Sequence, residues 1–192
     1  MVKILQKEEK ILRKEALEVH IKDIKTAKIK KIIREMSSAL KSQSDGVAIA
    51  APQIGYSLRI FVVSGKIFEK DFISNRDERF SGERPVDDVK QMKQTFKNLI
   101  FINPKISKLS REKEWVPEGC LSVRWLYGKT HRSKKALITA HDENGKKITR
   151  GASGLLAQIF QHETDHLNGI LFIDHAKDVK EELPAGKAGL PK

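Results

Sequence analysis

The residues best suited to chemistry form the motif His162-Glu163-Thr164-Asp165-His166 near the carboxyl end of the chain. Residues four apart on a helix lie about one turn apart on the same face, so both imidazoles can reach one metal ion while Glu163 stands beside the open position of that ion. The motif alone is a moderate signal, because it also arises by chance on polar helix faces. It predicts a metal site and leaves the reaction class to a third ligand.

Three sources of a third ligand can be compared. A histidine six residues after the second one would be typical of metzincins, but that position holds Phe172, so this option fails. A thermolysin-like site takes a glutamate from a following helix, and the downstream glutamates, Glu181 and Glu182, stand close to Pro184, so this option is weak. Cys120 remains, since a thiolate and two imidazoles make a three-ligand site with room for a water molecule.

Three segments of the chain resemble the motifs of the peptide deformylase family, in the order of that family. They are residues 46–55 (GVAIAAPQIG), 118–122 (EGCLS) and 161–169 (QHETDHLNG). The similarity extends over most of residues 1–175. It implies a metal-dependent hydrolase that removes the N-formyl group from the N-terminal methionine of nascent polypeptides and releases formate.

The resemblance also implies a ligand set and a proton carrier. Cys120, His162 and His166 would hold one divalent ion, Fe(II) in vivo, although such donors also accept Zn(II), Ni(II) or Co(II). Metal-bound water would attack the formyl carbon, with Glu163 as the general base and then the general acid.

Substrate contacts follow from the same resemblance. The side-chain amide of Gln53 and the backbone N–H of Leu121 would stabilise the oxyanion. The backbone around Ala48 would pair with the peptide as an added strand. Asp165 and Arg132 are expected around the ligands, because metal-bound imidazoles need acceptors and a buried Glu118 needs a cation. The methionine side chain is expected to lie against Val47, Val116, Leu155 and Ile159.

The chain departs from the family pattern at a few places. Ala48 stands where the family usually has a second glycine, and the added methyl group affects how closely a peptide can approach. Arg124-Trp125 replaces a common Pro-Gly, which predicts a reshaped rim of the cleft.

Two other functions compete with deformylation. One is a zinc endopeptidase that uses the same helix motif with a distant acidic ligand. The other is a deformylase-like protein that binds the ribosome or nascent chains, in agreement with the net charge of +12. Retention of Cys120, Glu163 and Gln53 argues against this third function, because a binding protein has no physical need for a base beside an open coordination site.

Hydrophobic periodicity predicts the elements that position these residues. An α+β fold is expected, a single domain in which mixed or antiparallel strands pack around a central helix with the HExxH motif, with an N-terminal amphipathic helix. The helices are predicted at 24–40 and at 153–167, the latter with Ser153 as its N-cap. The other predicted elements are an edge segment at 46–55, strands at 58–63 and 99–102, and a hairpin of 136–140 with 147–150.

The catalytic domain is predicted over residues 1–180, with 65–98 as a surface insertion and 181–192 as a disordered tail. The chain has one cysteine, Cys120, which fits a reducing compartment, and no apolar stretch long enough to span a bilayer. A bacterial-type cytoplasmic protein is therefore expected, without membrane contact. In residues 1–41, 12 Lys and Arg stand against six Asp and Glu. This charge favours transient ribosome association, without sequence-specific recognition of nucleic acid.

Overall fold

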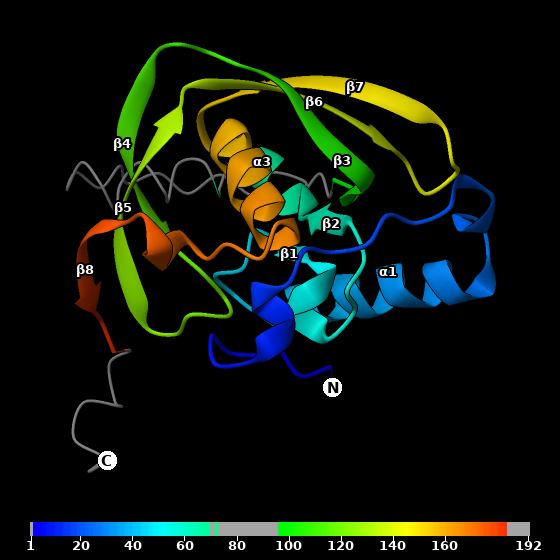
Figure 1. The fold of residues 1–192 in the computed structure, drawn as a ribbon, viewed down its shortest axis with the longest axis horizontal. Helices are drawn as coiled ribbons and strands as arrows, with labels where there is room; N and C mark the ends of the chain where they lie inside the picture. Colours follow the sequence, from blue (N-terminus) through cyan, green and yellow to red (C-terminus); the bar gives the residue numbers. More distant parts are fainter. Residues whose placement is uncertain (1, 70–71, 73–95, 184–192) are drawn as a thin grey trace, which may run out of the picture.

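The computed structural model describes residues 2–69, 72 and 96–183. Two antiparallel sheets and two main helices make up this part of the chain (Figure 1). The larger sheet has the strand order β1-β2-β3-β6-β7, and the smaller one β4-β5-β8. The five strands of the larger sheet are β1 (Ala48–Ala50), β2 (Ile60–Val63), β3 (Leu99–Leu109), β6 (Lys135–His141) and β7 (Lys147–Ser153). The smaller sheet contains β4 (Lys113–Gly119), β5 (Leu126–Ser133) and β8 (Lys177–Glu181).

Helix α1 (Ala27–Lys41) begins after Thr26, whose side-chain oxygen accepts a hydrogen bond from the backbone N–H of Ile29. The predicted start at Ile24 was three residues early, because a capping threonine satisfies the first free N–H groups of the helix. Apolar side chains on one face of α1 are buried in a cluster with alternate residues of the larger sheet, such as Ile49 and Val62.

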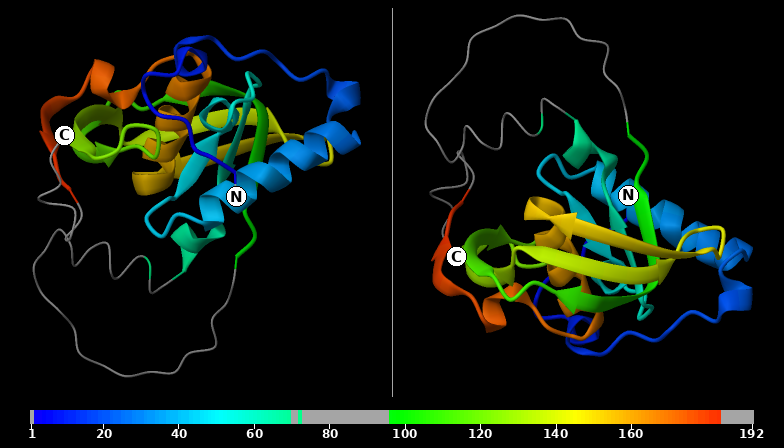
Figure 2. Two further views of the ribbon diagram at one scale, coloured as in Figure 1. Left: turned by 90° about the horizontal axis from the view of Figure 1, so that it is seen from below. Right: turned by 90° about the horizontal axis from the view of Figure 1, so that it is seen from above.

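Helix α3 (Gly154–Leu167) lies against the opposite face of the larger sheet (Figure 2). Successive side chains of a strand point to opposite faces, so Phe61 and Phe101 face α3 while their neighbours face α1. Phe160 of α3 packs edge-on against Phe101, with 5.1 Å between ring centroids. The same helix also contacts β5 of the smaller sheet, so it lies between the two sheets.

Several sequence predictions need correction. Strand β3 does not stop before Asn103 but continues to Leu109, because Asn103 forms a bulge and its side-chain amide binds both backbone groups of Val19. Ser153 is the N-cap residue of α3, as predicted, although its side chain makes no capping hydrogen bond. The hairpin is confirmed, with Ala140 opposite Ile148.

The smaller sheet was not predicted as such. Strand β8 reaches Glu181, the first residue of the predicted tail, and the backbone N–H of Glu182 donates to the carbonyl of Trp125. Of the predicted surface insertion at 65–98, the 3-10 helix Gly65–Phe68 is described, and Gly65 and Ile67 are buried. Residues 70–71, 73–95 and 184–192 lie outside the described residues. In the described part of the chain, no helix is long and apolar enough to cross a membrane.

Candidate active site

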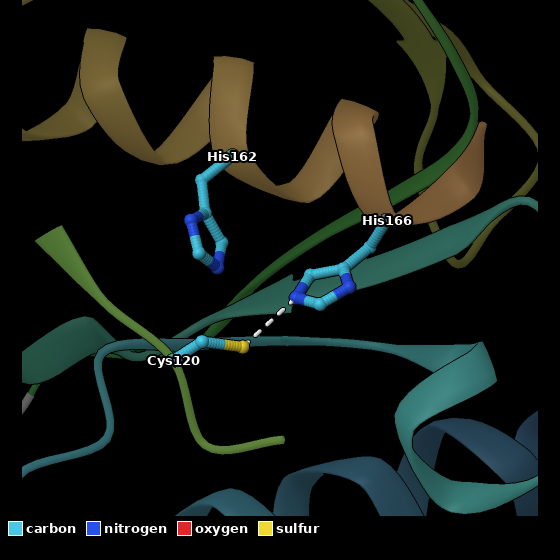
Figure 3. A group of neighbouring side chains, drawn as sticks. All are labelled: Cys120, His162 and His166. Atoms are coloured by element: carbon cyan, nitrogen blue, oxygen red, sulfur yellow. Dashed lines mark hydrogen bonds between the residues drawn. The ribbon is translucent and has the colours of Figure 1, made fainter. Parts of the chain in front are cut away.

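The three predicted ligand residues lie close together beside the C-terminal half of α3. Cys120 follows the end of β4, and His162 and His166 project from α3 toward it (Figure 3). Their possible ligand atoms all lie within 4.8 Å of one another, and Cys120 Sγ is 3.1 Å from His166 Nε2. One sulfur and two imidazole nitrogens converging in this way form a donor set suited to a divalent transition metal.

The orientation of His162 is set from outside the cluster. Its Nδ1 lies 2.6 Å from Oε1 of Glu118, which directs Nε2 toward Cys120. Burial opposes the charged imidazole, but Glu118 and Cys120 outweigh it and raise the pKa of His162 well above the usual range. For His166, burial and the neighbouring His162 lower the pKa well below that range.

Glu163 lies beside the ligand group in the wall of a cavity of about 290 Å³. Burial raises the pKa of this carboxyl group to about 7. Its Oε2 atom is buried and has no hydrogen-bond partner among the described residues, and the same holds for Nδ1 of His166. A buried acceptor without a partner is destabilising, so the site fits a water molecule or substrate proton at Glu163.

The amide orientation of Gln53 is fixed by two hydrogen bonds. Its Oε1 accepts from the backbone N–H of Ala50 at 2.8 Å, and its Nε2 donates to Ser122 Oγ at 3.0 Å. The same Nε2 lies 3.5 Å from Cys120 Sγ. Gln53 belongs to the 3-10 helix Ala51–Ile54, which follows β1 directly. The chain thus presents an N–H donor to the cavity beside the ligand group.

The predicted substrate-binding residues separate into two groups. Val47, Ala48, Leu155 and Ile159 line the cavity, and so does Leu121. Val116 does not line it. This residue sits two positions before Glu118 in β4, about 7 Å farther along the strand. Gln158 lines the cavity and had no predicted role; its Nε2 donates to the carbonyl of Pro117 at 2.9 Å.

Contacts around the ligands differ in part from expectation. Arg132 binds both Glu118 and Asp165, as a buried carboxylate requires. However, the acceptor for His162 is Glu118, whereas Asp165 lies 3.8 Å from His175. From the sequence we expect Glu118 to pair with a cation only, because nothing in the sequence shows that this residue of β4 lies next to His162 of α3.

Other residues that shape the site had no predicted role. Ser122 accepts a hydrogen bond from Gln53 and so orients it. This serine belongs to the motif at residues 118–122, but it had no predicted role of its own. The side chain of Gln6 donates to the carbonyl of Leu121 at 3.1 Å, and its Oε1 accepts from the backbone N–H of Arg124. No local pattern links Gln6 to a loop more than a hundred residues away.

Together, the fold and the site define an α+β protein in which one cysteine sulfur and two imidazoles converge next to a carboxyl group, an arrangement typical of metal-dependent hydrolases. Comparison with known proteins agrees. The model of the polypeptide deformylase family matches residues 1–182. The chain therefore belongs to the polypeptide deformylase family, and it is an enzyme of that kind.

Individual relatives support the assignment over nearly the whole chain. Peptide deformylase 2 of Clostridium acetobutylicum is 39% identical over 167 residues, which cover 87% of this chain and 89% of the relative. The peptide deformylase of Leptospira biflexa is 34% identical over 178 residues, or 93% of this chain and 89% of the relative.

Solved structures agree as well. A peptide deformylase of Synechococcus elongatus in complex with actinonin has a TM-score of 0.70 and 29% identity, and the match covers 92% of this chain and 79% of that one. A class I type b enzyme of Acinetobacter baumannii with bound Met-Ala-Ser has a TM-score of 0.72 and 26% identity, with 91% and 99% coverage.

Proposed function

We propose that this enzyme hydrolyses the N-formyl group from the N-terminal methionine of nascent polypeptides and releases formate. The observation that carries the proposal is the convergence of Cys120, His162 and His166 beside the buried carboxyl group of Glu163, in a cavity bordered by β1. The Met-Ala-Ser peptide bound to the Acinetobacter relative supports a peptide as the ligand of the cavity.

The metal is assigned to Cys120 Sγ and to Nε2 of both His162 and His166. We propose Fe(II) in the cell, with Zn(II), Ni(II) and Co(II) as ions that the same donors accept. When bound, such an ion supplies Lewis acidity and lowers the pKa of a water that it coordinates. Cys120 would hold the ion through Sγ, and Glu118 keeps Nε2 of His162 turned toward the site through the hydrogen bond at Nδ1.

Glu163 moves the proton. In this proposal its carboxylate takes a proton from the attacking water and then gives it to the nitrogen of the departing amine. A carboxyl group with a pKa of about 7 serves both roles near neutral pH, since it neither holds nor releases a proton too strongly. The absence of a protein partner at Oε2 in the described residues leaves this atom available for the transfer.

The developing negative charge falls on the formyl oxygen. We assign its stabilisation to the Nε2 group of Gln53 and to the backbone N–H of Leu121, both of which belong to residues lining the cavity. Because Ala50 and Ser122 fix the amide of Gln53, this donor needs no reorientation during the reaction.

The methionine side chain is assigned to the apolar part of the cavity, and the peptide backbone to the edge of β1 at Ala48. In the described part of the chain, β1 pairs with β2 on one side only, so its other edge is available for an added strand. The apolar contacts proposed for methionine are Val47, Leu155 and Ile159.

The net charge of +12 supports transient association with the ribosome, whose RNA is a polyanion. This association would place the enzyme near emerging chains. It requires no sequence-specific contacts, and it weakens as ionic strength rises.

An anaerobic assay of formate release from formyl-Met-Ala-Ser, with metal analysis of the same sample, tests the proposal. We expect turnover by the wild type, and a loss of several orders of magnitude in Glu163→Ala and Cys120→Ser. Unchanged rates in either variant contradict the assignment. Cleavage of internal peptide bonds that survives Cys120→Ser indicates an endopeptidase instead, and a metal-replete sample without formate release indicates a binding protein.

A further inference from the structure

The side chain of Arg124 joins the two walls of the cavity. It extends from the loop after Cys120 to Asp45, which precedes β1. Its Nη1 and Nη2 donate to the two carboxylate oxygens of Asp45 at 2.5 and 3.1 Å, and Nη2 also donates to Gln43 Oε1 at 3.0 Å. Both Arg124 and Asp45 line the same cavity as Glu163.

The guanidinium group is held firmly in this position. The Arg124 side chain is only 17% exposed, and its Cζ lies 4.9 Å from the ring centroid of Trp125. The planar fork of arginine matches a carboxylate through two parallel hydrogen bonds, so the pair fixes direction as well as distance. The Asp45 hydrogen bond is also the main cause of a raised pKa of Arg124.

The geometry of β1 shows where a bound peptide would run. The carbonyl of Val47 accepts a hydrogen bond from the backbone N–H of Ser64 at 2.8 Å. In an antiparallel pair the backbone N–H and C=O groups of successive residues point alternately toward and away from the partner strand. Those of Ala48 therefore point away from β2. Because the formyl end must lie near Glu163, later residues of a peptide that pairs with Ala48 extend toward Asp45.

We propose that Arg124 is a positioning residue that holds residues 45–47 in the place where the second and third residues of a peptide substrate pair with this edge. The inference deepens the proposed deformylation and depends on it. It predicts that the ion pair matters more as the substrate becomes longer, because formyl-methionine alone does not extend along this segment.

The test compares formyl-Met amide with formyl-Met-Ala-Ser in wild type, Arg124→Ala and Asp45→Asn. For the tripeptide, we expect KM to rise roughly tenfold, with kcat within about twofold. In the same variants, the loss of kcat/KM for the amide should be at least about fivefold smaller than the loss for the tripeptide. As a matched control, Lys134→Ala breaks another ion pair, with Glu112, at residues that do not line the cavity. It should leave both substrates unaffected.

Rescue distinguishes positioning from general damage. Arg124→Lys keeps the charge but not the fork, so its KM should be intermediate. The double variant Arg124→Asp with Asp45→Arg, which exchanges the two charges, should restore part of the rise in KM for the tripeptide. Equal losses for both substrates, or no loss in either variant, overturn the inference. Thermal unfolding of each variant shows whether it is folded. If Arg124→Ala does not fold, Asp45→Asn, which preserves side-chain size, tests the positioning role. No formate release by the wild type rejects the proposed function instead.

Discussion

The Oε1 atom of Glu118 lies 2.6 Å from Nδ1 of His162. An ionised carboxylate can only accept, so this contact requires a proton on Nδ1 and turns Nε2 toward the cavity. Arg132 donates to the same carboxylate through Nε and Nη2, and to Asp165 through Nη1. Burial opposes ionisation of Glu118, but His162 and Arg132 outweigh it and lower the pKa of the carboxyl group. The network therefore orients an imidazole with charges that are themselves buried.

Substitution of Arg132 should destabilise the fold strongly. Arg132→Met removes the arginine partner of the buried Glu118, and breaking such a pair costs about 3–5 kcal/mol. Urea unfolding monitored by circular dichroism measures the free energy of unfolding. In the control Lys134→Met, which removes an exposed ion pair, we expect a much smaller loss, because solvent screens exposed charges. Similar losses of unfolding free energy in the two variants would show that the buried ion pair stabilises the fold no more than an exposed one.

Replacement of Glu163 by glutamine should separate catalysis from stability. The variant keeps the size of the side chain but cannot carry the proton, so kcat should fall by about 10² to 10⁴. Because Oε2 is buried without a partner among the described residues, chelator-treated Glu163→Gln should be at least as stable as the wild type. Formate release and urea unfolding provide the two measurements. A stable variant with wild-type kcat would remove Glu163 from the mechanism.

Gln53 is best tested with a variant that keeps one of its hydrogen bonds. Gln53→Glu still accepts from the N–H of Ala50 but lacks the donor, so kcat should fall by about 10² to 10³. Ser122→Ala retains the donor and removes the oxygen that orients it, so we expect a smaller fall. Steady-state kinetics with formyl-Met-Ala-Ser compares the variants. A larger effect of Ser122→Ala than of Gln53→Glu would contradict the assigned role.

The Asp45 carboxylate should contribute stability that depends on pH. The hydrogen bond from Arg124 lowers the pKa of Asp45, burial opposes this effect, and Lys66 adds a smaller favourable charge. A group with a lowered folded-state pKa stabilises the fold above its unfolded pKa of about 3.9, and this contribution disappears as pH falls through the folded-state value. The difference in unfolding free energy between wild type and Asp45→Asn should therefore shrink from pH 6 to pH 3. A difference that stays constant over this range would contradict the prediction.

Local patterns in the sequence were sufficient for several elements. The helix that contains His162 and His166 follows from apolar spacing, and the hairpin of β6 and β7 from the turn at residues 143–145. Strands β4 and β5 were harder to predict. In β5 buried and exposed residues alternate, but Arg132 occupies one of the buried positions, and the buried residue of β4 is Glu118. These two charged side chains face inward and bind each other. Periodicity treats such residues as exposed, so the smaller sheet was missed.

Residue types and spacing by themselves determined the chemistry available to this protein: one thiol, two histidines four apart, and a glutamate between them. These features depend on covalent order and helical geometry, which are local. Only the tertiary structure decided that Cys120 lies 3.1 Å from His166, that Glu118 orients His162, and that Arg124 reaches Asp45. Each of these contacts joins segments that are distant along the chain, and their distances depend on how two sheets pack around one helix.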